Sequence, residues 1–327
     1  MRHVRRSVCL LSLTVLLAAL VACKPTTGPK QPPLPGETVK IRIGVQPIEA
    51  ALPIWVAEEA GLFKKAGLDA KVEVFESATD RNTALLANAI DCTQADPISI
   101  GLLEKGGFPV SATTILLGAT PQEGRDGIVA RPGLKARTLS DLAGVPVGTS
   151  LDTHQEFIVD SLFAEAGIPK NKVKKEEVKK TPIRYELLME GKLDAAALPE
   201  PWLTLAVFKG GTLVADDTKG ANISQELLIG SDKWLATAEG AEAMKRLLGV
   251  LNEAATLIDK NPEAWRQTLI DNSGVPQELQ KAYPVPTFPG TQLPTEEMLG
   301  SQMQWMVGKG LLDTPLPYDR LVWRPTN

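Results

Sequence analysis

The chain has 327 residues, of which 43% are hydrophobic and 23% charged, so its composition is that of a globular protein with one large or two medium domains. Its formal net charge is −4 at pH 7. A mildly acidic chain argues against nucleic acid as a partner, because binding to phosphates needs a basic patch.

The first 37 residues are typical of an export signal followed by a tether. A basic start precedes an apolar run from Val8 to Leu20, which is too short to span a membrane. Residues 20–23, Leu-Val-Ala-Cys, resemble a bacterial lipobox, in which the cysteine is lipidated. We therefore expect a lipoprotein signal peptide over 1–22, lipidation at Cys23, and a proline-rich tether over 23–37. The alternatives are an uncleaved anchor and a plain secretory signal.

Cysteine is scarce, with three residues in all. Cys9 lies in the predicted signal and Cys23 at the predicted lipidation position, which leaves Cys92 as the one thiol of the mature chain. An intramolecular disulfide is then excluded, and the mature protein depends on its hydrophobic core. We expect Cys92 to be a small buried residue rather than a nucleophile.

Strands and helices are predicted to alternate from residue 39 onwards. Strands are expected where apolar residues alternate or run together, and helices where they recur every three to four residues. The expected elements of the first block are a strand over 40–45, one helix from about 52 that ends at Gly67, a strand over 71–75, a helix over 81–90 and a strand over 91–95.

The same order of elements recurs in a second block. It has strands over 145–149, 173–178 and 194–198, with helices over 152–166 and 183–190 between them. Alternating strands and helices predict an α/β fold with a mostly parallel sheet flanked by helices, and two similar blocks predict two similar lobes. The remainder is expected to be mainly helical, over 244–258, 262–270 and 295–307.

The residues that follow the strands are the candidate binding residues. Ligands of open α/β sheets bind beyond the carboxyl ends of the strands, so two facing lobes predict a cleft lined from both sides. Two tryptophans are added because an indole can stack on a flat ring. The candidates are Gln46, Glu49, Trp55, Ser77, Thr79 and Asp96 from the first block, and Thr149, Ser150, Asp152, Glu200 and Trp202 from the second.

Several candidates also fit a purely structural role. Asp152 with Gln155 fits a helix capping box, as does Thr138 with Asp141. Trp55 lies on the apolar stripe of its predicted helix, which favours packing in the core. Glu49 can equally face solvent in a first helical turn, where a carboxylate opposes the helix dipole.

Four segments carry a resemblance to a known family. They are 43–46 (Ile-Gly-Val-Gln), 57–63 (Ala-Glu-Glu-Ala-Gly-Leu-Phe), 139–144 (Leu-Ser-Asp-Leu-Ala-Gly) and 190–202, which runs from Glu-Gly-Lys-Leu-Asp to Glu-Pro-Trp. Together they resemble the extracytoplasmic solute-binding proteins of ABC importers, in the branch for nitrate, sulfonate, taurine and thiamine-pyrimidine precursors. The likeness covers nearly all of residues 39–228.

The resemblance implies a two-lobed fold of the periplasmic-binding-protein type II kind. Its chain crosses between lobes twice, so 38–130 and 220–327 would form the first lobe and 131–219 the second. Crossings near 127–130 and 222–229 would act as the hinge. The implied partners are a small solute, an ABC permease with its ATPase, and the membrane surface that holds the lipid anchor. We expect a monomer on the extracytoplasmic side.

Carboxylates near the predicted cleft bear on the ligand's charge. Sulfonate-binding relatives tend to have a small hydroxyl residue near the position of Glu49. A carboxylate there, together with Glu76, Asp96, Asp152 and Glu200, would repel an oxyanion in a partly desolvated site. We therefore expect a nitrogenous ligand, such as an aminopyrimidine or an amine. An oxyanion, such as a sulfonate, taurine or nitrate, is the alternative.

Catalysis has little support in the sequence. His154 is the one histidine after the predicted signal, and no nucleophile motif, metal-ligand spacing or glycine-rich phosphate loop is present. We expect no enzymatic activity, no metal and no cofactor. Two alternatives stay open, namely an enzyme on the same scaffold, of the pyrimidine or menaquinone pathways, and a ligand sensor for a membrane kinase.

Overall fold

The computed structural model describes residues 37–123, 125–275, 279–281 and 283–325. The predicted signal peptide, Cys23 and almost all of the tether lie outside these residues. Within the described ranges, every helix is too short or too polar to cross a bilayer.

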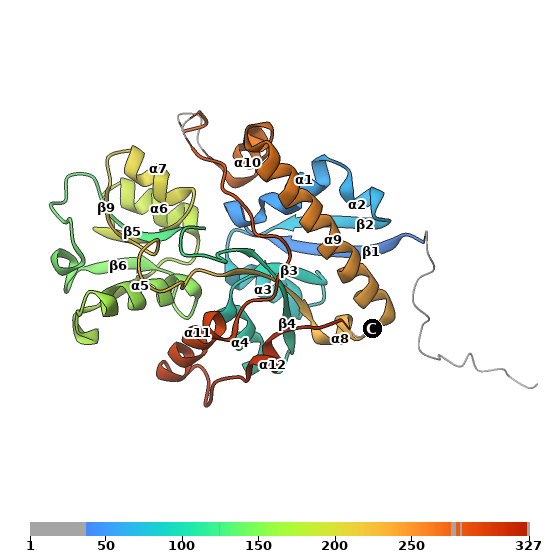
Figure 1. The fold of residues 1–327 in the computed structure, drawn as a ribbon. Helices are drawn as coiled ribbons and strands as arrows, with labels where there is room; N and C mark the ends of the chain where they lie inside the picture. The colour runs from blue at the N-terminus through green and yellow to red at the C-terminus, as the bar shows by residue number, and fades with distance from the viewer. Residues whose placement is uncertain (1–36, 124, 276–278, 282, 326–327) are drawn as a thin grey trace, which may run out of the picture.

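Two five-stranded sheets, each flanked by helices, form two lobes that lie side by side (Figure 1). The first lobe contains β1 (Val39–Val45), β2 (Leu68–Val74), β3 (Cys92–Ala95), β4 (Val110–Leu117), β10 (Glu226–Ser231), η1 (Glu49–Ala51), α1 (Leu52–Glu59), α2 (Leu62–Lys65), α3 (Ala78–Leu86), α4 (Pro97–Lys105), α8 (Asp232–Leu235), α9 (Ala238–Lys260), η4 (Pro262–Trp265), α10 (Arg266–Ser273), α11 (Glu296–Gly308) and α12 (Tyr318–Leu321). The second contains β5 (Asp126–Ala130), β6 (Pro146–Thr149), β7 (Lys174–Glu177), β8 (Ala195–Pro199), β9 (Thr212–Asp216), η2 (Leu139–Leu142), α5 (His154–Glu165), η3 (Lys170–Lys172), α6 (Thr181–Met189) and α7 (Trp202–Phe208).

Both sheets are mixed, with orders β2-β1-β3-β10-β4 and β7-β6-β8-β5-β9. β10 runs antiparallel to β3 and β4, and β5 runs antiparallel to β8 and β9. In each lobe the strand that arrives from the other lobe is therefore the one that runs against its neighbours. The two-lobed α/β architecture is confirmed, and the sheets contain more antiparallel pairing than the repeated blocks predict.

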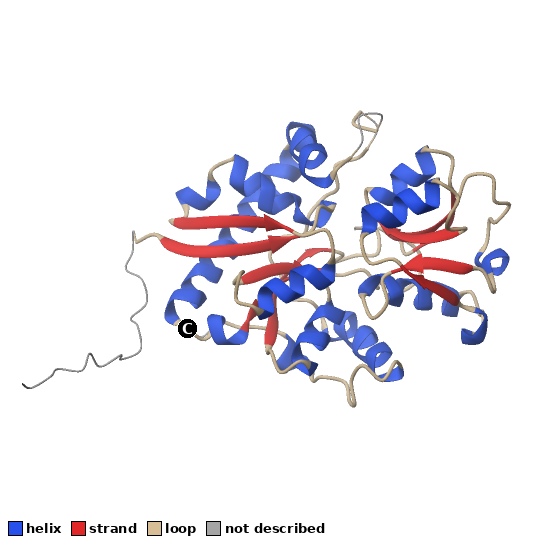
Figure 2. Ribbon diagram, turned by 180° about the vertical axis from the view of Figure 1, so that it is seen from behind, coloured by secondary structure: helices blue, strands red, loops and turns tan. Residues whose placement is uncertain are grey.

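The position of β5 corrects the first predicted crossing. Residues 126–130 were expected to close the first lobe, but β5 pairs with β8 and β9 of the second sheet. The first crossing is therefore the segment between β4 and β5, and the second is the segment between β9 and β10. Figure 2 shows both sheets from behind, with the crossing segments between them.

The two crossings contact each other at Gly118. Its φ of +87° is one that glycine adopts readily, and a Cβ at this position would overlap the backbone oxygen of Ser224. Asn222 Nδ2 donates to Gly118 O at 2.9 Å. Further along, Asp126 N donates to Asp217 Oδ1 at 3.0 Å, and Asp217 N donates to Asp126 O at 3.1 Å. Backbone and side-chain hydrogen bonds thus tie the two crossings together.

The predicted helix over 52–67 is two helices. Gly61 has a φ of +68° and separates α1 from α2, so the single-helix prediction was wrong. The apolar stripe continues through the break because Trp55 and Phe63 are both buried in the same core cluster. Further helices agree with the prediction, and Thr295 caps α11 by accepting a hydrogen bond from Met298 N at 3.3 Å.

Helix α11 connects the first lobe to α5 of the second. Trp305 Nε1 donates to Asp160 Oδ2 at 2.9 Å, and the Trp305 ring meets Phe157 edge-on at 5.7 Å between centroids. Lys309 Nζ lies 2.6 Å from Glu156 Oε1, which is fully buried. The contacts between the lobes are therefore made by this C-terminal helix as well as by the two crossings.

Candidate functional site

Three neighbouring cavities lie where the lobes meet. The inner cavity, of about 40 Å³, shares Ala78, Thr153 and Lys179 with an outer cavity of about 550 Å³. It shares Ile48, Pro199 and Glu226 with a third cavity of about 20 Å³, which we call the acidic cavity. The inner cavity is lined by Gln46, Ile48, Ala78, Asp96 and Glu226 of the first lobe and its crossing, and by Ser150, Thr153, His154, Gln155, Lys179, Thr181, Arg184 and Pro199 of the second lobe.

Arg81 organises the first-lobe wall of the inner cavity. Its side chain is fully buried, and it donates to Gln46 Oε1 at 2.7 Å and to Ser99 Oγ at 2.9 Å. The guanidinium also lies 3.5 Å from Asp96 Oδ2. Asp96 in turn caps α4 by accepting from Ser99 N at 2.8 Å. The negative charge of Asp96 is therefore balanced within the lobe.

The second-lobe wall is built around the start of α5. Thr153 is its N-cap, but its hydroxyl donates to Ser150 O at 2.7 Å instead of capping the helix. The first N–H groups of a helix have no partner within the helix, and His154 and Gln155 belong to this turn. An uncapped helix start that borders a cavity is suited to an anion, because its N–H groups and dipole are both positive there.

Unpartnered polar atoms gather at this wall. Five buried side-chain N or O atoms of the described residues lack a hydrogen-bond partner. Three of the five are Thr149 Oγ1, His154 Nε2 and Gln155 Oε1. His154 and Gln155 line the inner cavity, and His154 Nε2 faces Asp126 Oδ2 at 3.5 Å without a hydrogen bond. Leaving a buried polar atom unpaired costs roughly 1–3 kcal/mol. The Thr149 hydroxyl can donate to a ligand, whereas Gln155 Oε1 can only accept a hydrogen bond.

His154 and Arg184 bring positive charge to the inner cavity. Burial lowers the pKa of His154, but Asp126, whose Oδ2 lies 3.5 Å from Nε2, outweighs it and raises the pKa to about 9. Burial lowers the pKa of Arg184 to about 10. Arg184 donates to two backbone carbonyl oxygens, of Ala197 and Val178, each at 2.7 Å, and has no carboxylate within 4.0 Å among the described residues. Both side chains are cationic at pH 7.

The one further carboxyl group of the inner cavity carries little negative charge at neutral pH. Burial, and then the neighbouring Asp96, raise the pKa of Glu226 to about 8. Gln94 Nε2 donates to this carboxyl group. With Asp96 balanced by Arg81, His154 paired with Asp126 and Glu226 mostly protonated, Lys179 and Arg184 leave the inner cavity with an excess of positive charge.

The acidic cavity holds a carboxyl pair that joins the lobes. Glu49, in η1, accepts a hydrogen bond from Tyr283 Oη at 2.5 Å, and Tyr283 Oη also lies 3.4 Å from Glu200 Oε2. Arg125 Nε donates to Glu200 Oε1 at 2.8 Å. Burial, and then the charge of Glu200, raise the pKa of Glu49 to about 8. The proton on Glu49 and the Arg125 guanidinium therefore offset the negative charge of the two carboxyl groups, and the Tyr283 hydroxyl donates to Glu49.

The predicted residues separate into four groups. Gln46, Asp96 and Ser150 line the inner cavity, Thr79 and Asp152 line the outer cavity, and Glu49 and Glu200 line the acidic cavity. The other four line none of the three cavities. Of these, Ser77 caps α3, Thr149 is buried at the end of β6, and the two tryptophans, Trp55 and Trp202, pack against other side chains. Trp55 is 3% exposed and belongs to the core of the first lobe. Trp202 packs on Tyr185, with 5.4 Å between ring centroids.

The capping predictions had different outcomes. Thr138 N and Oγ1 both donate to Asp141 Oδ2 at 2.9 Å, as predicted. Asp152 is not the cap of α5; it has a φ of +56° and lies at the outer cavity, and Gln155 donates to Asp126 instead. The αL backbone at Asp152 turns the chain so that Thr153 becomes the N-cap.

Five ionisable residues of the inner cavity and its wall were absent from the sequence-based candidates. They are Arg81, His154, Lys179, Arg184 and Glu226. Arg81 and Arg184 lie within helices rather than directly after strands, so the strand-end rule does not select them. Lys179 belongs to a basic run that is typical of a solvated face. Glu226 opens a strand whose pairing partners are more than a hundred residues earlier in the chain.

Nucleophiles and metal ligands are sparse among the described residues. Cys92 is fully buried and burial raises the pKa of its thiol well above its usual value, which confirms the expected small buried residue. Across the described ranges, no group of three or more His, Cys, Asp or Glu side chains is arranged to hold a metal ion.

Comparison with known proteins gives a family match and a fold match. Residues 49–265 match the family model described as NMT1/THI5 like. A Brucella abortus (strain 2308) protein whose name describes a binding protein is 25% identical over 218 residues, which are 64% of this chain. The match spans 63% of that relative's own length.

Three solved structures show the same fold. The alkanesulfonate-binding protein SsuA of Xanthomonas axonopodis pv. citri, bound to MOPS, superposes with a TM-score of 0.75 at 19% identity, over 89% of this chain and all of that chain. The aliphatic sulphonate binding protein SsuA of Escherichia coli gives 0.74 at 17% identity, over 89% and 94%. The nitrate-binding protein NrtA of Synechocystis PCC 6803 gives 0.65 at 18% identity, over 89% and 85%.

Proposed function

Because this chain belongs to the NMT1/THI5-like family and has the fold of a type II periplasmic binding protein, we propose that it is the substrate-binding component of an ABC importer. In this proposal its two lobes close on a small oxyanion in the inner cavity. The closed form is then recognised by a membrane permease that works with an ATPase. Hinge closure around a ligand is the motion that such folds use.

One observation carries the proposal. The first N–H groups of α5 lie at an uncapped helix start that borders a cavity between two lobes. Backbone N–H donors and a positive helix end meet there, and a sulfonate, nitrate or related oxyanion accepts from several donors at once. Arg184, a buried cation with no ion-pair partner among the described residues, adds the charge that an anion would balance.

The expectation of a nitrogenous ligand loses its physical basis. It rested on five carboxylates that would face the ligand together. Glu49 and Glu200 share their charge with Tyr283 and Arg125 in the acidic cavity. Glu76 forms an exposed ion pair with Lys180 at 2.6 Å. Asp152 lies at the outer cavity, and Asp96 is balanced by Arg81, so the inner cavity favours an anion.

The lipid anchor and the permease belong to the same proposal. A receptor tethered through Cys23 by the segment 23–37 would stay at the membrane surface where its permease works. Mass spectrometry of the protein purified from its own membranes tests this part. The expected result is a mature N-terminus at Cys23 that carries acyl chains.

A thermal-shift screen tests the ligand. Methanesulfonate, taurine, nitrate and sulfate form one arm, and ethylamine, putrescine and an aminopyrimidine form the other. A ligand at 100 times its Kd adds about 2.7 kcal/mol to the unfolding free energy, because it binds the folded state alone. We expect shifts in the anion arm. Shifts confined to the amine arm would reverse the charge assignment, and no shift in either arm would contradict the receptor function.

A further inference from the structure

A buried tyrosine lies between carboxyl groups of the two lobes. Tyr283 follows α10 of the first lobe and is 2% exposed. Its hydroxyl donates to Glu49, in η1 of the same lobe, at 2.5 Å, and lies 3.4 Å from Oε2 of Glu200, which follows β8 of the second lobe. Because a phenol has one hydrogen, Tyr283 donates to one carboxyl group at a time. The other donors at this contact therefore decide which of the two groups is ionised.

The donors are divided unequally between the two carboxyl groups. Glu200 accepts from Arg125 Nε at 2.8 Å, from Thr204 N at 3.1 Å and from Thr204 Oγ1 at 2.8 Å. Among the described residues, Glu49 accepts from the Tyr283 hydroxyl alone. Hydrogen bonds to a carboxylate favour its charged form, so Glu200 is the ionised member of the pair and Glu49 holds a proton.

Charged groups on three neighbouring segments complete the surroundings. Arg125 precedes β5, and Asp126 of β5 and Glu226 of β10 line the same cavity. Burial and then the charge of Glu200 raise the pKa of Glu49 to about 8, although Arg125 acts in the opposite direction. With the lobes in contact, Glu49 therefore keeps its proton at pH 7.

Separating the lobes would undo this arrangement. Glu200 N donates to Arg125 O at 3.0 Å, so the arginine is tied to the second lobe, whereas Glu49 and Tyr283 belong to the first. In an open form Glu49 would face water without Glu200 beside it, and its pKa would return towards the ordinary value of 4.5. Opening therefore releases a proton at neutral pH, and closing takes one up.

The contacts that α11 makes with the second lobe keep their charges over the same range. Burial raises the pKa of Glu156, but hydrogen bonds from Lys175 and Lys309 outweigh it and lower the pKa overall. Trp305, which donates to Asp160, carries no charge. This side of the interface therefore responds little to a change in pH around neutrality.

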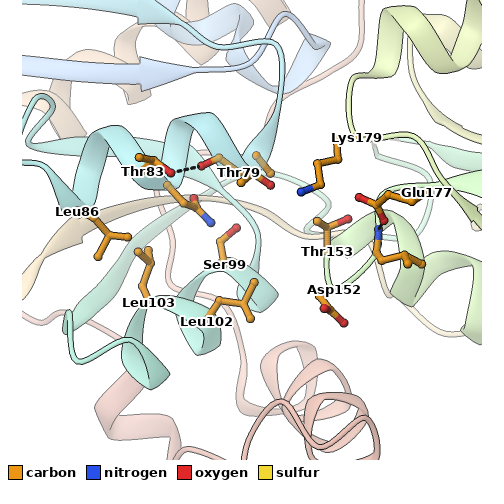
Figure 3. A pocket seen from close by; sticks show the side chains of 13 residues that line it. Thr79, Thr83, Leu86, Ser99, Leu102, Leu103, Asp152, Thr153, Glu177 and Lys179 are labelled. Atoms are coloured by element: carbon orange, nitrogen blue, oxygen red, sulfur yellow. Dashed lines mark hydrogen bonds between the residues drawn. The ribbon is translucent and has the colours of Figure 1, made fainter.

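The lobes are less firmly joined around the outer cavity, whose two walls face each other in Figure 3. Thr83 Oγ1 donates within its own helix at 2.8 Å, and Leu151 N donates to Glu177 of the same lobe at 2.8 Å. The ion pair between Lys180 and Glu76 spans the lobes, but both side chains are half exposed, and such a pair contributes little. The carboxyl pair of the acidic cavity is therefore the contact between the lobes that is most sensitive to pH.

We propose that Glu49 and Glu200, with Tyr283 between them, form a proton-dependent latch that favours the closed form as the pH falls. The proposal rests on the hinge closure of the proposed function and on no particular ligand. Capture becomes tighter in a mildly acidic medium and release becomes easier as the pH rises, whichever oxyanion the inner cavity takes.

Energy transfer between two dyes measures closure without any ligand. Lys64 of α2 and Glu186 of α6 are exposed and lie in different lobes, and in the full chain each is replaced by p-azidophenylalanine, to which a donor and an acceptor dye are attached. The equilibrium constant for closing should fall on the order of a hundredfold from pH 5 to pH 7.5, because the closed form holds a proton whose pKa is raised from 4.5 to about 8. The dyes should therefore move apart as the pH rises.

Variants at both members of the pair test the assignment. Glu49→Gln needs no proton to close, so it should stay closed at pH 7.5 and lose most of the pH dependence. Glu200→Gln removes the neighbouring charge and should weaken the dependence from the side of the second lobe. Glu58→Gln, at an exposed carboxyl of α1, is the matched control and should behave as the wild type. The thermal transition of each variant checks that it is folded.

The outcomes separate the latch from the receptor function. Energy transfer that stays constant from pH 5 to pH 7.5 in the wild type would overturn the latch. An equal change in Glu49→Gln and the wild type would also overturn it, because the proton would then be held elsewhere. If the lobes respond to pH as expected but no compound of the thermal-shift screen binds, the latch survives and the receptor function is wrong. Binding of an anion without any pH response of the lobes would have the reverse meaning.

Discussion

Replacing Glu49 by glutamine should make the protein more stable, by an amount that grows with pH. The Glu49 carboxyl group is 7% exposed and lies beside Glu200, and its pKa is raised from 4.5 to about 8. At pH 7 the folded protein therefore keeps a proton that the unfolded chain has released. Glutamine is neutral at every pH and its oxygen still accepts from Tyr283, so the variant avoids this cost.

The size of the effect comes from the pKa difference. Below pH 4.5 both states hold the proton, and the contribution of the protonated carboxyl to stability is fully present. It is lost as the pH rises from 4.5 to about 8, at about 1.4 kcal/mol per pH unit. Glu49→Gln should therefore gain about 1 kcal/mol at pH 5, about 3 at pH 7 and at most about 5 above pH 8.

Thermal unfolding of the ligand-free protein between pH 5 and pH 9 measures this gain. In a chain of this size about 1 kcal/mol corresponds to roughly 2 °C, so the variant should melt about 10 °C higher at pH 9 and about 2 °C higher at pH 5. Glu58→Gln, at an exposed carboxyl of α1, is the matched control and should leave the difference flat with pH. A pH-independent gain, or a loss at pH 9, would refute the buried carboxyl pair.

Three further changes test the cleft and the hinge. Lys179→Met should weaken methanesulfonate about tenfold at low salt and less at 0.5 M salt, and equal affinity at low salt would remove Lys179 from the site. Methanesulfonate affinity should fall between pH 8 and pH 9, because Glu226 ionises and His154 loses its proton in this range. The fall should be smaller in Glu226→Gln. An affinity that does not change with pH in the wild type would count against both assignments. Gly118→Ala should lower the free energy of unfolding in urea by about 2–4 kcal/mol, because its Cβ would overlap the backbone of Ser224. Gly249→Ala, at an open position on α9, should raise it by up to about 1 kcal/mol. Equal effects would contradict the close contact between the two crossing segments at Gly118.

Local patterns predicted most of the helices and strands. The strand over 40–45 and the helix over 244–258 follow from apolar periodicity, which depends on near neighbours in the chain, and both are present as β1 and α9. The order of strands in each sheet could not be predicted in this way. β10 pairs with β3 and β4 across more than a hundred residues, and no local pattern specifies such a partner. For the same reason the sequence left β5 on the wrong side of the first crossing.

The charge of the site could not be predicted because it depends on distant partners. The sequence shows a carboxylate at Glu49, but Tyr283, which donates to it, is 234 residues away. Arg81, which balances Asp96, is 15 residues from it in sequence but on another helix. His154 is the one histidine after the predicted signal, and its sequence context does not indicate its charge, whereas Asp126 makes it a cation in the folded protein. The strand-end rule selected residues of all three cavities, whereas the sign of the charge there depends on the folded arrangement.

The insertion of β10 between β3 and β4 constrains the order in which the molecule can be assembled. A nascent chain that has been synthesised as far as β9 has made four strands of the first sheet, yet β3 and β4 cannot be joined until β10 emerges. Until then each of the two presents an unpaired edge, and such edges promote aggregation. A C-terminal truncation before Glu226 should therefore yield insoluble material rather than a smaller binding module, and the first lobe cannot be produced by cutting the gene at the end of its first segment.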